Sequence, residues 1–110
     1  MLQVSFRRVK PGKVDILREW MRELKQRSAE VVESFEHEGV REEKAWLMED
    51  EQGYILVYAI EADDLDRARQ AYRDSTLAID LEHREVLRDV LGERVKPELL
   101  YEIAVNIGAK

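Results

Sequence analysis

The chain has 110 residues, of which 45% are hydrophobic and 38% charged, and its formal net charge at pH 7 is −6. This length and balance are typical of one soluble globular domain, so we expect a single domain over residues 1–110. The acidic charge, without a Lys/Arg cluster clear of acidic neighbours, argues against a nucleic-acid partner. The chain has no cysteine, which excludes disulfides and thiol chemistry, and no apolar run of the roughly 18 residues that a membrane span needs. We therefore expect a cytoplasmic protein.

The first two elements are predicted by a change of hydrophobic period. Residues 2–9 alternate apolar and polar side chains, which indicates a β-strand, and Lys10-Pro11-Gly12 then forms a turn. From Lys13 the apolar residues recur at spacings of three and four, which predicts one amphipathic helix of at most about seven turns. Gly39 is a natural stop for that helix.

A β-hairpin is predicted in the middle of the chain. Residues 40–48 and 54–61 are rich in β-branched, aromatic and aliphatic side chains, and the short polar loop Glu49–Gly53 separates them. Both faces of this hairpin are apolar, since Trp46 and Met48 alternate with Ala45 and Leu47.

The second half of the chain predicts two helical pieces and a last strand. Asp63 or Asp64 can cap the first piece, which residues 74–76 end or interrupt, and a second piece runs from about Asp80 to Gly92. Alternating apolar residues then predict a strand at Leu99–Ile107.

The predicted order β-α-β-β-α(α)-β is that of a ferredoxin-like α+β fold, with an extra short helix before the last strand and a four-stranded antiparallel sheet. Such a sheet usually leaves one polar face to solvent, but here both faces are apolar. Because no part of the chain remains to cover the second face, we expect a homodimer formed through it.

Two segments support a family resemblance. Residues 9–13, leading to Leu17-Arg18-Glu19-Trp20, resemble the strand-turn-helix opening of the dimeric α+β-barrel superfamily, which includes cofactor-free antibiotic-biosynthesis monooxygenases and rhamnose-mutarotase-like proteins. Residues 57–68 are similar to the junction between strand and second helix in mutarotase-like members. The resemblance implies an uncharacterised family of that superfamily, with two sheets face to face in a homodimeric barrel and a pocket in each half. The histidine motif of the mutarotases has no counterpart in the first helix, so no catalytic residue is carried over.

His83 is the candidate catalytic residue, together with Tyr58. It lies on the apolar side of its helix, and if Asp80 is the N-cap, the helix dipole favours a neutral imidazole that can donate and accept protons at pH 7. The alternative is that His83 is a packing residue in the core or at its rim.

The sheet face that lines the barrel supplies candidate ligand-binding residues. If Val4 and Phe6 face the helices, the residues that face the barrel interior with Tyr58 are Ser5, Arg7, Lys44, Trp46, Glu102 and Asn106. Arg7 can clamp a small polar or anionic molecule there, or can simply form an interior ion pair with Glu102. A shift of one residue inverts this assignment.

Three function classes follow. The first is a small-molecule enzyme of the isomerase or cofactor-free oxygenase type, the second a non-catalytic binding or sensing module, and the third a structural dimer with a filled barrel. The sequence contains no phosphate-binding glycine loop, paired-histidine metal spacing or nucleophile elbow, so we expect no metal and no cofactor.

Overall fold

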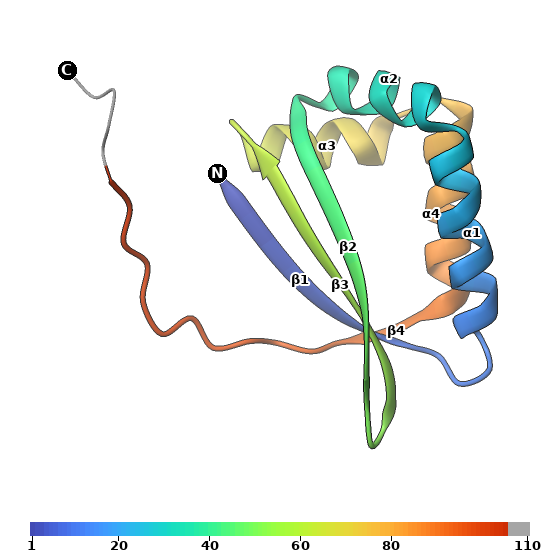
Figure 1. The fold of residues 1–110 in the computed structure, drawn as a ribbon. Helices are drawn as coiled ribbons and strands as arrows, with labels where there is room; N and C mark the ends of the chain where they lie inside the picture. Colours follow the sequence, from blue (N-terminus) through green and yellow to red (C-terminus); the bar gives the residue numbers. More distant parts are fainter. Residues whose placement is uncertain (106–110) are drawn as a thin grey trace.

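A computed structural model describes residues 1–105 of the chain and has an α+β architecture. Helices cover one side of a twisted, four-stranded antiparallel sheet (Figure 1). The elements are β1 (Leu2–Val9), α1 (Val14–Gln26), α2 (Ser28–Glu38), β2 (Val40–Asp50), β3 (Gly53–Ala62), α3 (Leu65–Asp74), α4 (Ala78–Val90) and β4 (Leu91–Arg94). Within residues 1–105, no helix has both the length and the apolar character needed to cross a membrane.

The sheet has the order β2-β3-β1-β4, so β3 and β1 are its central strands. The predicted strand 2–9 and the predicted hairpin are confirmed, although the hairpin loop is only Glu51–Gln52. Gly53 follows the loop with φ of 123°, a backbone conformation that glycine adopts without steric cost. The Arg8 guanidinium crosses to the loop and binds both carboxylate oxygens of Asp50 at 2.9 and 2.8 Å, which ties the hairpin end to β1.

The helix predicted from Lys13 to Gly39 is two helices, because the chain bends at Arg27, where φ is −104° and ψ is 35°. α1 then runs along α4, whereas α2 turns away across the end of the sheet (Figure 1). The prediction of one helix is therefore wrong, but its stop at Gly39 is confirmed, with φ of 77° at that residue.

The caps of the later helices differ in how well they were predicted. Asp64 caps α3, since its side chain accepts a hydrogen bond of 3.0 Å from the Arg67 backbone N–H, as predicted. α4 starts earlier than predicted and its N-cap is Leu77, so Asp80 lies inside the first turn of the helix and is buried.

The last strand is earlier than the alternation predicted. β4 follows α4 directly and pairs with β1, and residues 95–105 lie in no strand, so the predicted strand Leu99–Ile107 is wrong over its described part. Its last two residues, Asn106 and Ile107, lie outside the described residues.

A proline explains why the chain leaves β1 after β4. The Val95 N–H still donates to the Phe6 carbonyl at 2.9 Å. Continuing the same register places Pro97 opposite Val4, where the next ladder hydrogen bond needs an N–H that proline lacks.

The two faces of the sheet are distinct, and their assignment corrects the sequence prediction for β1 and for Tyr58 but agrees with it for Lys44 and Trp46. Ser5 and Tyr58 are paired across β1 and β3 and face the helices, whereas Val4 (42% exposed) and Trp46 (50% exposed) lie on the other side. The helix side carries the buried core around Leu56, to which Val9, Leu17, Val90 and Leu91 belong. The side without helices, called the open face below, carries Leu2, Val4, Phe6, Arg8, Lys44, Trp46, Met48, Ile55, Val57 and Ala59.

Candidate functional site

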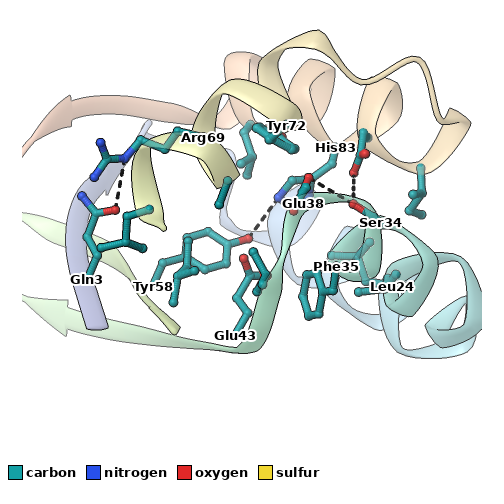
Figure 2. Close-up of a pocket in the computed structure, with 18 of the residues that line it drawn as sticks. Gln3, Leu24, Ser34, Phe35, Glu38, Glu43, Tyr58, Arg69, Tyr72 and His83 are labelled. Carbon is teal, nitrogen blue, oxygen red and sulfur yellow. Dashed lines mark hydrogen bonds between the residues drawn. The ribbon is translucent and has the colours of Figure 1, made fainter. Parts of the chain in front are cut away.

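A pocket of about 190 Å³ lies between the helix side of the sheet and helices α2, α3 and α4 (Figure 2). Most of its wall is apolar: Leu24, Val31, Phe35, Val40, Ile60, Leu65, Ala68, Ile79 and Leu87. The polar side chains that line it are Gln3, Ser5, Ser34, Glu38, Glu43, Tyr58, Arg69, Tyr72, Asp80 and His83. An apolar pocket with a few converging polar groups is the usual form of a small-molecule site.

His83, on α4, is held by hydrogen bonds at both ring nitrogens. The Trp20 indole N–H donates to Nδ1 at 2.8 Å, and Nε2 lies 3.3 Å from the Tyr58 hydroxyl oxygen. Since indole is a donor only, Nδ1 must be the acceptor, and the ring proton then resides on Nε2 and points at Tyr58. Burial lowers the pKa of His83 to about 4, against a small opposing effect of Asp80, so the imidazole is neutral at pH 7.

Asp80 is the best-satisfied carboxylate of the site. Its two oxygens accept hydrogen bonds from the hydroxyls of Ser34 at 2.7 Å and Ser75 at 2.6 Å. One of the Glu38 oxygens lies 3.2 Å from the same Ser34 hydroxyl. A serine has a single hydroxyl proton, and the Ser34 hydroxyl makes its shorter contact to Asp80, so Glu38 receives only the weaker share of that donor.

The pKa values of two carboxyl groups in the pocket are raised to neutrality. Burial, together with the nearby charge of Asp80, raises the pKa of Glu38 to about 7. The same two causes, in the same order, raise the pKa of Glu43 on β2 to about 7. Unlike Glu38, Glu43 has no hydrogen-bond partner within residues 1–105, which leaves its carboxyl group available to a ligand.

Two tyrosines complete the polar part of the pocket. Burial raises the pKa of both Tyr58 and Tyr72, so both phenols stay protonated at neutral pH. The Tyr72 hydroxyl is buried and has no partner among the described residues, whereas its ring packs edge-on against His83 with centroids 6.0 Å apart. A free buried hydroxyl of this kind is a donor for a bound molecule.

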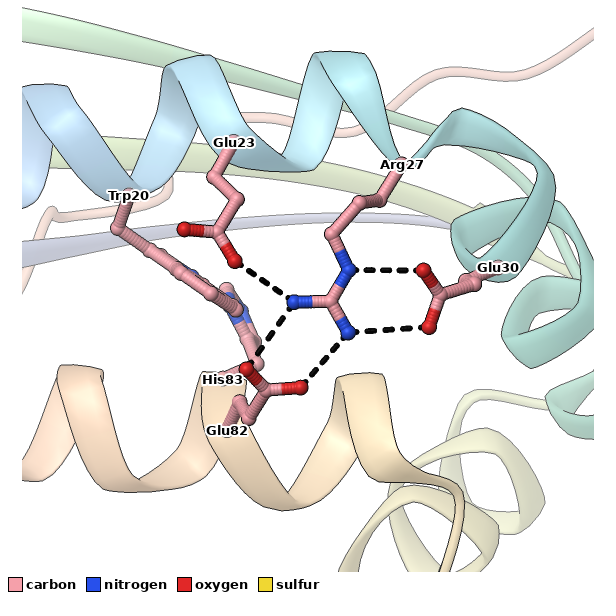
Figure 3. Close-up of polar contacts among 6 residues, drawn as sticks. All are labelled: Trp20, Glu23, Arg27, Glu30, Glu82 and His83. Atoms are coloured by element: carbon pink, nitrogen blue, oxygen red, sulfur yellow. Dashed lines mark hydrogen bonds and ion pairs between the residues drawn. The ribbon is translucent and has the colours of Figure 1, made fainter.

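Arg27 fixes the helix that carries Ser34 and Glu38. At the bend between α1 and α2 its guanidinium binds Glu23, Glu30 and Glu82 at 2.7–3.0 Å, and the pairs with Glu30 and Glu82 are both bidentate (Figure 3). Glu82 belongs to α4 and is adjacent to His83. The cluster therefore sets α2 against α4, the two helices that form one end of the pocket.

The predicted site residues divide into two groups. The structure brings His83, Tyr58 and Ser5 together in this pocket. The Arg7 guanidinium instead donates to the Gly92 carbonyl, at 3.0 Å from Nε and 2.6 Å from Nη2, and not to Glu102. Lys44 and Trp46 lie on the open face, Glu102 is exposed beyond β4, and Asn106 lies outside the described residues.

Sequence reasoning missed Glu38, Glu43 and Tyr72 as pocket residues. The signal for Glu43 was its place in β2, two residues before Ala45 and four before Leu47, on the same face of the strand as these apolar residues. Glu38 and Ser34 are four residues apart and hence on one face of a helix, but nothing in the sequence places that face opposite Asp80.

Glu43→Gln should remove the loss of folding stability that Glu43 causes in the wild type as the pH rises. The folded-state pKa of Glu43 is about 7 and the ordinary value is 4.5, so the folded state binds more protons between these values. The stabilisation of the folded state that comes from protonated Glu43 is therefore complete below pH 4.5 and is lost as the pH rises through 7. Chemical denaturation should show the variant gaining about 2–3 kcal/mol over the wild type between pH 5 and pH 8.

The opposite effect of His83 is present in both proteins and cancels in this comparison. Glu49→Gln, at an exposed position of the same strand, is the control and should leave the pH profile unchanged. Parallel profiles for Glu43→Gln and the wild type would show that Glu43 is ionised at neutral pH like an ordinary surface carboxylate.

Comparison with known proteins yields a family but no characterised relative. No curated protein and no solved structure matches the chain. The profile of one family, described as a family of unknown function (DUF6176), matches residues 2–106. Because this match spans nearly the whole sequence, the chain belongs to that family of unknown function.

Proposed function

We propose that the protein is a small-molecule enzyme of the isomerase type, which moves a proton on a substrate bound between the sheet and the helices. The observation that carries this proposal is the Glu43 carboxyl group, which lines the pocket without a hydrogen-bond partner among residues 1–105 and has a pKa of about 7. A carboxyl group with a pKa near the working pH can accept a proton and return it efficiently.

The other polar groups have supporting roles in this proposal. Tyr72 offers its unpartnered hydroxyl to a substrate oxygen or nitrogen. Tyr58 accepts the Nε2 proton of His83, which leaves its own hydroxyl proton free to point elsewhere in the pocket. Since both nitrogens of His83 are engaged within the protein, His83 is a positioning residue for Tyr58 and does not itself transfer the proton.

The charges of the pocket favour a neutral or cationic substrate with an apolar body. Among the pocket-lining residues within 1–105, Arg69 is the single cation, and it is engaged with Gln3 and Asp66 at 3.3 and 3.0 Å. Asp80 with Glu38 and Glu43 makes the polar end acidic, which disfavours the anionic ligand that the sequence suggested.

Hydrogen–deuterium exchange at carbon tests the proposal without knowledge of the product. A thermal-shift screen of small ketones, aldehydes and amines comes first, and the compounds that bind are then incubated with the protein in D₂O. We expect NMR to show C–H exchange with the wild type and with Glu49→Gln. In Glu43→Gln the exchange rate should fall by about 100-fold or more, since general acid–base catalysis contributes at least that much.

A non-catalytic binding module is the second candidate, and the closed hydrogen-bond network around His83 and Asp80 favours it. In that case compounds raise the melting temperature but no C–H exchange occurs, or exchange is equal in wild type and Glu43→Gln. Either result would remove the enzymatic proposal and leave binding.

We further propose that the fold is the ferredoxin-like type and that two copies join through their open faces as a dimeric α+β barrel. What supports this is the apolar character of the open face, where Leu2, Val4, Trp46 and Met48 are each at least 42% exposed. Contiguous apolar surface of this kind on a sheet is typical of an interface.

Light scattering during size-exclusion chromatography tests the dimer. The protomer mass is 13.0 kDa, and we expect twice this mass at micromolar concentration. Trp46→Glu should shift the protein toward the protomer mass because it buries a charge in the interface, whereas Glu19→Ala, on an exposed part of α1, should not. A wild-type mass of one protomer would contradict the proposed dimer.

A further inference from the structure

The segment from Val95 to Val105, called the arm below, has the composition of a buried strand but is exposed. Leu99, Leu100, Tyr101, Ile103 and Val105 are each 76–84% exposed. The arm leaves the sheet at β4 and extends away from the helices and the rest of the sheet (Figure 1). Apolar residues that alternate over such a length are typical of a strand with one buried face.

The arm cannot continue its backbone pairing with β1 of its own sheet. Pro97 lacks the N–H that would continue the ladder with Val4. Even in an uninterrupted register, β1 ends at Leu2, opposite Leu99, so Tyr101, Ile103 and Val105 would extend past the end of β1. Among residues 1–105, therefore, no strand of the same chain lies beside the most apolar part of the arm.

The sheet, in turn, has surface that lacks a partner. The open face exposes Trp46 and Met48 on β2, and β2 is an edge strand with a neighbour on one side only. The consecutive apolar residues 45–48 of this edge strand can serve as a template for a strand from another chain.

We propose that the arm of each copy docks on the open face of a second copy, along β2, so that two copies exchange arms. This inference rests on the dimer proposed above and assigns the segment that covers its interface. Each chain has both an exposed arm and an exposed open face. In a dimer with a two-fold axis, the arm of each copy can therefore cover the open face of the other. Open face and arm together present about twenty side chains, which is what one partner contributes to a stable interface of standard size.

Cross-linking tests the exchange directly, because the chain has no native cysteine. A tagged Ile103→Cys chain and an untagged Met48→Cys chain are refolded together and treated with a short bismaleimide. We expect a covalent heterodimer on a denaturing gel. The matched control replaces Met48→Cys by Glu19→Cys on the helix side and should give none.

The doubly substituted chain, carrying both Ile103→Cys and Met48→Cys, separates exchange from folding back. Exchange predicts covalent dimers that persist on dilution, whereas a single covalently looped chain would show that the arm docks on its own sheet and would overturn the proposal. A protein with the mass of a dimer but no arm-to-face cross-link would also overturn it, while leaving the dimer and the pocket function intact.

Ile103→Asp supplies a second readout. Because Ile103 is 84% exposed in the protomer, the substitution leaves the protomer fold intact, which circular dichroism can verify. We expect the dimer dissociation constant to rise by tenfold or more, with Glu102→Ala as the neighbouring control. An unchanged dissociation constant would show that the arm takes no part in the interface.

Discussion

The hydrogen-bond chain from Trp20 through His83 to Tyr58 is the constraint on which the site depends. It joins α1, α4 and β3, and each step follows from the chemistry of the step before it. The indole can only donate, so the imidazole accepts at Nδ1 and carries its proton at Nε2. Burial lowers the pKa of the imidazole to about 4 and so keeps the ring neutral, with Nδ1 free of a proton that would otherwise face the indole N–H. The Tyr58 oxygen is thereby used as an acceptor and its hydroxyl proton is left for the pocket.

The negative charge in the pocket resides on the carboxyl group that receives the most hydrogen bonds from the protein. Asp80 accepts from two serine hydroxyls and so can hold a charge in a buried position. Burial and the nearby charge of Asp80 raise the pKa values of Glu38 and Glu43 to about 7, so both carboxyl groups are partly protonated at neutral pH. Arg27 lies at the helix bend, where its guanidinium forms ion pairs with three other carboxylates, so its charge does not neutralise the carboxyl groups of the pocket. The pocket can therefore offer and accept protons while its walls stay apolar.

Local sequence signals predicted the local structure and missed what depends on distant contacts. Strand 2–9, the hairpin and the Asp64 cap follow from period, turn chemistry and capping preference. The bend at Arg27 has no glycine or proline to mark it, and the helical period continues through it. The faces of β1 and β3 were assigned wrongly, whereas Lys44 and Trp46 on β2 lie on the side away from the helices as predicted. Both faces are apolar, so period-2 alternation does not tell them apart. At Leu99–Ile107 the alternation indicated a strand, but Pro97 lacks the N–H that would continue the hydrogen bonding with β1. Glu38, Glu43 and Asp80 meet only through the fold, and no spacing in the sequence indicates their proximity.

The measurement that tests this account most directly is a carbon-13 NMR titration of the glutamate side-chain carboxyl groups, with Glu43→Gln and Glu38→Gln spectra used for assignment. We expect two glutamate resonances with midpoints at about pH 7, and the midpoint of Glu43 should fall when Asp80→Asn removes the nearby charge. Titration of Glu43 near pH 4.5 would contradict the account, because the pocket would then contain an ordinary ionised carboxylate and no proton-transfer group at neutral pH.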